Sequence, residues 1–269
     1  MNKCLVCGNT QKELGIVLNK KIYRCTNCGF GQTEKLKAHR GEYHRDNTYI
    51  EEESFFSNIF QKRVNKIINF KKNGRVLEIG CSTGLMLSML SKKGWEVIGI
   101  EISKEAADMA MKRGIQVYTE PFENIELSQK FDLIILNHTL EHLENPKKVL
   151  EKIYSILAKN GLLYIDVPNF GGLSASIQKG NWPLLLPNEH LWHFTEKSLN
   201  ILLTELKYKI IYIEKASGIW DLENPLKELL ISLVNFKKRF FSELITAFPA
   251  FFISKIGIGS DLMIIAKKN

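Results

Sequence analysis

The chain has 269 residues, of which 45% are hydrophobic, and a formal net charge of +8 at pH 7. This length suits one domain of ordinary size with appendages. No window of about 18 uncharged apolar residues occurs, which argues against a membrane-spanning helix. The opening MNKCLVCGNT lacks the apolar stretch of a secretory signal. We therefore expect a cytoplasmic protein. The positive charge favours RNA, an anionic membrane surface or phosphorylated substrates, unless it reflects only a lysine-rich surface.

Four cysteines lie near the start of the chain, in two C-x2-C pairs separated by 17 residues. Each pair suits a tight turn that aims two thiolates at one ion, and Gly8 and Gly29 follow the pairs where such a turn favours positive φ. A zinc ribbon is therefore predicted over residues 1–32, with a hairpin between the pairs. Disulfides are the alternative, which a cytoplasmic location disfavours. Binding nucleic acid, packing as a lid and shaping a substrate pocket are its alternative roles. The predicted metal ligands are Cys4, Cys7, Cys25 and Cys28.

Residues 33–70 connect the ribbon to the rest of the chain. The stretch 33–50 is polar and mixed, which is typical of a linker. Residues 51–70 follow with helical periodicity. The apolar side of this predicted helix consists of Phe56, Ile59, Phe60, Val64, Ile67 and Ile68.

The most informative stretch is RVLEIGCSTG (75–84), in which an apolar run breaks into a glycine-containing loop. An amphipathic helix follows at once, so the segment predicts strand, tight turn and helix, the opening unit of a doubly wound nucleotide-binding sheet. The glycines let the backbone approach a ligand closely, and the helix N-terminus supplies N–H groups. Glu101 ends the next apolar run, 23 residues after Glu78, which suits a carboxylate that binds the ribose hydroxyls of an adenosine.

Strands and helices alternate beyond this loop, which indicates an α/β fold with a mainly parallel sheet. Ser103 is a predicted N-cap, and Asn145-Pro146 gives an N-cap followed by proline. Gly114 and Gly161 are predicted to stop helices. Strands are predicted near 75–79, 96–100, 115–118, 131–136, 161–166, 208–213 and 261–267, and helices near 84–92, 103–113, 146–158 and 196–206.

The segment 216–258 is a long insertion before the last predicted strand. It is rich in Leu, Ile and Phe, is interrupted by Lys237-Lys238-Arg239, and is predicted as two amphipathic helices broken at Pro249. Apolar and basic residues together favour a helix at a membrane surface, here the inner membrane face. A helical cap on the domain and a homodimer interface are the alternatives.

The glycine loop reads E-x-G-x-x-x-G and resembles motif I of class I S-adenosylmethionine-dependent methyltransferases; FDLIILNHTLEHLENP (131–146) resembles their fourth-strand motif. The resemblance implies a Rossmann-like core over 71–269, whose seven-stranded sheet has an antiparallel last strand. It implies S-adenosylmethionine as cofactor, its ribose on Glu101, with the 51–70 helix covering it. Cys81 is more a small filler in the loop than a nucleophile. The implied cofactor-binding residues are Glu78, Gly80, Cys81, Ser82, Gly84, Glu101, Ile102, Glu120, Phe122, Asn137 and His138.

Histidines and a glutamate cluster after the fourth and fifth predicted strands, at the end of the sheet where ligands bind. A hydroxyl acceptor must lose a proton, and histidine accepts one near neutral pH, so His138 and His190 are the candidate bases. The alternatives are structural histidines or a divalent metal. The pattern H-x-x-E-H resembles the E-x-x-E-H metal site of small-RNA 2′-O-methyltransferases and ubiquinone-pathway O-methyltransferases, although His138 replaces the first acid. The candidate catalytic residues are His138, Glu141, His142, His190 and His193.

The segment NEHLWHFT lies in the expected acceptor loop, residues 168–196. It resembles the H-L-x-x-F segment of a bacterial methyltransferase subfamily often met beside glycan-assembly enzymes. The implied acceptor is a small molecule or glycan, methylated at a hydroxyl or carbon of a sugar, nucleotide-sugar or lipid-linked intermediate. The ribbon also resembles the N-terminal module of nucleotide-sugar C-methyltransferases. RNA is an alternative acceptor, since ribosomal-RNA guanine methyltransferases place a zinc ribbon before such a core, but N-H-T-L stands where base methylation uses N-P-P-[YF]. A quinone-like or lipid acceptor and a non-catalytic role are further alternatives.

Overall fold

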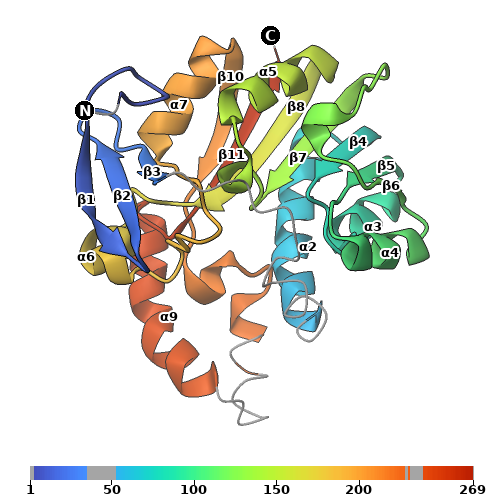
Figure 1. Cartoon of the computed structure of the whole chain (residues 1–269). Coiled ribbons are helices and arrows are strands. Elements are labelled where there is room, and N and C mark those ends of the chain that lie inside the picture. The colour runs from blue at the N-terminus through green and yellow to red at the C-terminus, as the bar shows by residue number, and fades with distance from the viewer. Residues whose placement is uncertain (1–2, 35–52, 228–229, 231–238, 269) are drawn as a thin grey trace.

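The computed structural model describes residues 3–34, 53–227, 230 and 239–268, and shows a layered α/β core with a small N-terminal sheet beside it (Figure 1). Of the predicted linker, residues 35–50 lie outside the described part of the chain. Lys237 and Lys238 of the insertion lie outside it as well.

Seven strands form the large sheet. From one edge to the other they are β10 (Tyr208–Glu214), β11 (Asp261–Lys268), β8 (Leu157–Pro168), β7 (Phe131–Asn137), β4 (Gly74–Ile79), β5 (Trp95–Ile100) and β6 (Gln116–Tyr118). β11 runs antiparallel to both neighbours, and the other pairs are parallel. This confirms the predicted sheet with its antiparallel last strand. The strand order reverses between β4 and β7, and ligands of such sheets bind beyond the carboxyl ends of the strands at this point.

Helices pack on both faces of the large sheet (Figure 1). One face is covered by α2 (Glu53–Phe70), α3 (Leu85–Ser91) and α4 (Lys104–Lys112), and the other by α5 (Pro146–Ile156) and α7 (Glu196–Glu205). The predicted apolar side of α2 is buried at Phe60, Val64 and Ile67. Each face of the sheet therefore has its own hydrophobic core. Helix α2 packs on the sheet next to the carboxyl ends of its strands.

Local signals for the ends of helices are confirmed except at one glycine. Ser103 and Asn145 accept backbone N–H bonds as N-caps, and Gly114 follows α4 with φ of +81°. Gly161 does not stop α5 but lies inside β8. A Cβ there would lie 3.0 Å from Phe131 O, so this glycine permits a close approach of β8 to β7 at an irregular point of the pairing.

The small sheet has the order β1-β2-β3-β9. Three of its strands come from the predicted ribbon: β1 (Gln11–Val17), β2 (Lys20–Cys25) and β3 (Gly31–Thr33). Leu18 and Asn19 both have positive φ between β1 and β2, as in the two-residue turn of a hairpin. The fourth strand, β9 (Trp192–His193), comes from the predicted acceptor loop. The ribbon is thus joined by backbone hydrogen bonds to the loop expected to bind the acceptor.

The predicted insertion contains the short helix η4 (Gly218–Asp221) and the longer α9 (Arg239–Lys255). The predicted break at Pro249 is wrong, since α9 continues through this residue. Pro249 is exposed, and a proline on the solvent side of a helix loses one hydrogen bond and bends the helix without ending it. Phe248, Phe252 and Ile256 form an exposed apolar stripe at helical spacing. No helix in the described ranges is long and apolar enough to cross a membrane, and contact of this segment with a membrane surface or a second copy stays a prediction.

Candidate active site

The predicted cofactor loop joins β4 to α3. Gly80 and Gly84 have φ of +74° and +72°. A Cβ at Gly80 would lie 2.6 Å from Thr139 Oγ1, and one at Gly84 would lie 2.5 Å from Ile115 Cδ1. Both positions therefore require glycine for conformation and for space, and the loop backbone stays close to the end of β7.

Glu101 follows β5 and is fixed beside this loop by two backbone N–H groups. Ser82 donates to its Oε2 and Ser103 to its Oε1, each at 2.8 Å. The carboxylate is buried just beyond the carboxyl end of β5. A fixed acceptor at this position is what the sequence predicted for a ribose ligand.

One carboxyl oxygen of Glu78 lacks a hydrogen-bond donor in the part of the chain that the structure describes. Its side chain is 2% exposed, and its Oε2 has no hydrogen-bond partner among the described residues. Burial, and then the charge of Glu101, raise the pKa of Glu78 well above its usual value. A buried carboxyl oxygen without a partner is costly, and the ammonium group in the methionine part of S-adenosylmethionine would supply the missing donor. The unpaired oxygen of Glu78 therefore fits the predicted cofactor.

The other predicted cofactor contacts differ in their surroundings. Cys81 is buried, and burial raises the pKa of its thiol well above the usual value, which agrees with a small filler. Ile102 is partly exposed, Glu120 is exposed, and Asn137 ends β7 with a buried Oδ1. Phe122 is only 2% exposed and packs into the core. The contact of this ring with an adenine stays a prediction.

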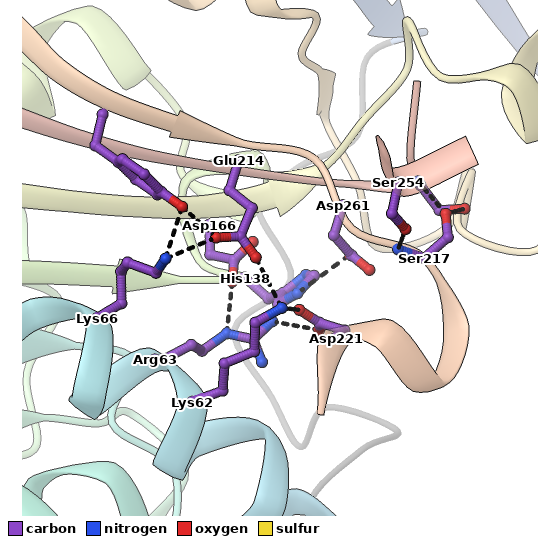
Figure 2. Close-up of polar contacts among 12 residues, drawn as sticks. Lys62, Arg63, Lys66, His138, Asp166, Glu214, Ser217, Asp221, Ser254 and Asp261 are labelled. Carbon is purple, nitrogen blue, oxygen red and sulfur yellow. Dashed lines mark hydrogen bonds and ion pairs between the residues drawn. The ribbon is translucent and has the colours of Figure 1, made fainter. Parts of the chain in front are cut away.

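His138 follows β7 and lies at the centre of a buried polar cluster (Figure 2). Its φ is +51°, a costly conformation for a residue with a side chain. Nδ1 lies 3.5 Å from Glu141 Oε1, and Nε2 lies 3.7 Å from Asp261 Oδ1. The carbonyl of Asp166 accepts the backbone N–H of His138 at 2.8 Å. The imidazole is therefore held between two carboxyl groups at the predicted mouth of the cofactor site.

Arg63 of α2 joins this cluster from the other side (Figure 2). Its Nε donates to Asp166 Oδ2 at 2.6 Å, and a terminal nitrogen donates to Asp221 Oδ2 at 3.1 Å. Sequence reasoning missed Arg63, Asp166, Asp221 and Asp261. One signal could have revealed them: a charged residue at a position that the hydrophobic periodicity assigns to the interior. Arg63, on the apolar side of its helix, is the clearest case.

The ionisation of the cluster suits proton transfer near neutral pH. Burial lowers the pKa of His138, but the nearby carboxyl group of Glu141 and the charges of Asp166 and Asp261 outweigh burial and raise this pKa. Burial above all raises the pKa of Asp261 to about 7. Burial also acts to raise the pKa of Asp166, but Arg63 and His138 lower it below the usual value. A histidine and a carboxyl group that lie close together with shifted pKa values are typical of acid–base sites.

Glu141, His142 and His190 form a second group. Glu141 is 1% exposed, and in the described ranges neither of its oxygens has a hydrogen-bond partner. His190 Nε2 lies 4.0 Å from Glu141 Oε1, and the rings of His142 and His190 meet edge to face. One ligand atom from each of the three lies within 4.8 Å of the others, a donor set that suits a transition metal. The three residues of the predicted H-x-x-E-H motif therefore do not form one candidate metal site, because the possible metal ligands grouped with His138 are Asp166 and Asp261. A metal-assisted role stays an alternative.

His193 lies between this group and the ribbon, with its ring centroid 6.3 Å from that of His190. Its Nε2 lies 2.9 Å from Thr33 Oγ1, and its ring packs against Phe170. Burial lowers the pKa of His193 to about 3. A group that binds protons so weakly is a poor base at neutral pH. His193 thus lies at the contact between ribbon and acceptor loop, and its catalytic role stays a prediction.

The four ribbon cysteines have the geometry of a metal site. Cys4 Sγ lies 3.6 Å from Cys28 Sγ, Cys7 Sγ lies 3.4 Å from Cys25 Sγ, and all four sulfur atoms lie within 4.8 Å of one another. A tetrahedral zinc ion with Zn–S bonds of about 2.3 Å places its sulfur atoms about 3.8 Å apart, whereas a disulfide needs about 2.0 Å. The donor set fits the predicted zinc.

The sheet order, the glycine loop after the first core strand and the acid after the second define an α/β enzyme of the S-adenosylmethionine-dependent methyltransferase class. A family model described as a methyltransferase domain matches residues 51–213. The chain belongs to this family.

Relatives and solved structures agree with this assignment. The chain is 30% identical over 118 residues to a ubiquinone biosynthesis O-methyltransferase of Glaesserella parasuis, covering 38% of this chain and 50% of that one. It is 25% identical over 150 residues to a malonyl-[acyl-carrier protein] O-methyltransferase of Bacillus cereus, covering 50% and 56%. The chain thus spans about half the length of these curated relatives.

A Thermotoga maritima structure, described as an S-adenosylmethionine-dependent methyltransferase and a possible histamine N-methyltransferase, matches with a TM-score of 0.57 and 19% identity, covering 84% of this chain and 98% of that one. The plantazolicin methyltransferase BpumL in complex with SAH (S-adenosylhomocysteine) matches with a TM-score of 0.53 and 23% identity, covering 83% and 88%. At these identities the structures show the fold.

We expect Gly80→Ala to weaken the binding of S-adenosylhomocysteine about tenfold or more, because the added methyl group must displace Thr139 and with it the loop. Gly94→Ala is the matched control. Gly94 has a similar φ of +86°, but no atom lies within 4 Å of the added Cβ. Titration calorimetry on both variants checks this expectation, and equal affinities would refute the close fit of the loop.

Proposed function

We propose that the chain transfers the methyl group of S-adenosylmethionine to a hydroxyl oxygen of its acceptor, with His138 as general base. The proposal rests on the placement of the His138 ring at the carboxyl end of β7, between Glu141 and Asp261. A base held by carboxyl groups at this edge of the sheet is what oxygen methylation needs in addition to a bound methyl donor.

The residues of the chain divide the work. Bound S-adenosylmethionine supplies a methyl group on a sulfonium, which is a good leaving group. Glu78, Glu101 and the glycine loop orient the donor, so that alignment supplies much of the rate. His138 keeps its Nδ1–H toward Glu141 and accepts the hydroxyl proton at Nε2. Asp261 faces that nitrogen and stabilises the imidazolium that forms.

Two relatives named as O-methyltransferases support oxygen as the methylated atom. Their names refer to ubiquinone biosynthesis and to malonyl-[acyl-carrier protein]. The sugar, nucleotide-sugar or lipid-linked glycan acceptor is the finer part of the proposal, and its support is the NEHLWHFT segment. Structural zinc on the four ribbon cysteines is part of the same proposal, supported by the spacing of their sulfur atoms.

The test is transfer of label from methyl-labelled S-adenosylmethionine into a cell extract that is then split into RNA, nucleotide-sugar, acyl-carrier and lipid fractions. We expect label in the sugar or lipid fraction, in a bond that resists mild alkali as an ether does. Label in the quinone-containing part of the lipid fraction or on the acyl carrier would keep methyl transfer to oxygen and reject the glycan. Label that ribonuclease removes would overturn the proposal in favour of RNA.

A further inference from the structure

The ribbon forms one continuous sheet with the acceptor loop. Gly31 and Gln32 of β3 pair with His193 and Trp192 of β9. The backbone N–H of Thr33 extends this ladder by donating to Leu191 O at 3.0 Å. The loop residue next to His190 is therefore bonded to a strand that begins just after the last metal-binding cysteine.

Thr33 fixes two histidines through one hydroxyl. Thr33 is 2% exposed, and its Oγ1 donates to the carbonyl of His190 at 2.7 Å. The hydroxyl has a single proton, so it accepts the second bond, at 2.9 Å, from His193 Nε2–H. Thr33 thereby sets the backbone at His190 and the tautomer of His193.

The other edge of the loop is bonded to the catalytic segment. Leu191 N donates to Glu141 O at 2.9 Å, and Trp192 Nε1 donates to Leu143 O at 2.8 Å. His190 is thus held with its Nε2 toward the buried carboxyl of Glu141. A shift of the ribbon strand would move this arrangement as a unit.

The metal-binding turn takes part in the same contact. The carbonyl of Cys28 accepts a bond from Thr195 Oγ1 at 2.7 Å. Phe30, directly after that turn, is fully buried and stacks on Trp192 with ring centroids 5.6 Å apart. A change in the geometry of this turn would therefore displace the acceptor loop. The glycine loop and Glu101 lie on other elements.

We propose that the ribbon is a positioning module for the acceptor loop, and that Thr33 is the residue through which it places His190 opposite Glu141. The four cysteines, with their metal, hold the end of β3 in register with β9. The ribbon then governs engagement of the acceptor and leaves binding of S-adenosylmethionine unchanged. The part of the proposal that concerns the acceptor rests on the proposed function.

Thr33→Val tests this role in the full chain, because valine keeps the shape and the strand preference and removes only the hydroxyl. We expect acceptor methylation (kcat/KM) to fall about 10-fold to 100-fold, as a misplaced site does, with the affinity for S-adenosylhomocysteine within about twofold. Thr33→Ser should restore most of the rate. Thr26→Val is the matched control, since among the described residues Thr26 Oγ1 bonds within the ribbon, to Thr10 O at 3.1 Å.

Nitrogen NMR of histidine-labelled protein gives a readout independent of turnover. We expect Thr33→Val, and removal of the metal with a chelator, to shift the ring signals of His190 and His193 and to release the tautomer of His193. Unchanged ring signals, or equal kinetics in Thr33→Val and Thr26→Val, would overturn the proposal. Loss of S-adenosylhomocysteine binding in the metal-free chain would also contradict it, because the ribbon would then support the whole fold. If the wild-type protein methylates none of the extract fractions, the proposed function fails. The binding and NMR results would still decide whether the ribbon positions the acceptor loop.

Discussion

His138→Asn should reduce methyl transfer about 10²-fold to 10⁴-fold, the range expected for loss of a general base. Asparagine is chosen because it tolerates the left-handed conformation that this position adopts, with φ of +51°. The variant therefore removes the imidazole and spares the turn. Affinity for S-adenosylhomocysteine should stay within about twofold, because the donor is held by the glycine loop and by Glu78 and Glu101.

Label transfer into the responsive extract fraction measures the rate, and calorimetry measures the affinity. His190→Asn provides the comparison, since His190 is the other predicted base. A larger loss at His190 than at His138 would move the base to the acceptor loop. Wild-type rates in both variants would refute histidine base catalysis in this chain.

Arg63→Met should destabilise the fold by about 3–5 kcal/mol, the usual cost of removing one partner of a buried ion pair. The variant leaves the buried carboxyl group of Asp166 without its cation, and leaves Asp221 with Lys62, whose Nζ lies 3.9 Å from Asp221 Oδ1. The variant also removes the hydrogen bond between α2 and β8. Urea unfolding followed by circular dichroism measures the free energy of unfolding.

The control for this variant is Arg75→Met. Arg75 also pairs with a carboxylate, Glu96, at 2.9 Å, but the two side chains are 36% and 60% exposed, and solvent-accessible pairs contribute little. We expect no resolved change in stability. Equal destabilisation by Arg63→Met and Arg75→Met would show that the ion pairs of Arg63 do not act as buried ion pairs.

The pH dependence of the Arg63 cluster follows from Asp166. Its pKa is lowered in the folded chain, so the stabilisation from its pairing is present above the unfolded pKa and is lost as pH falls through the folded value. The difference in the free energy of unfolding between wild type and Arg63→Met should therefore become smaller in acid.

Signals that lie close together in the sequence predicted their structures well. The two cysteine pairs, the glycine loop and the caps at Ser103 and Asn145 each depend on a few neighbouring residues, and the structure confirms the sheet built from them. Long-range contacts were not predictable from one sequence. Arg63 and Asp166 lie 103 positions apart, and nothing local marks them as partners.

The acceptor loop shows the same limit. His193 has the residue type and the neighbourhood of a catalytic group, but its partner is Thr33, 160 positions away. A two-residue strand such as β9 has no periodicity to reveal it. The error at Pro249 has a different cause, because a sequence does not tell whether a helical proline faces solvent or a neighbour.

The most direct test of His138 as the base is the single-turnover rate of methyl transfer measured against pH. Because the base must be neutral and its pKa is raised above the usual 6.5, we expect a low rate in acid. The rate should rise to a plateau, with its midpoint above that value. His138→Asn should show a low rate without this rise. A wild-type rate that does not change with pH, or the same rise in the variant, would contradict the assignment of His138 as the base.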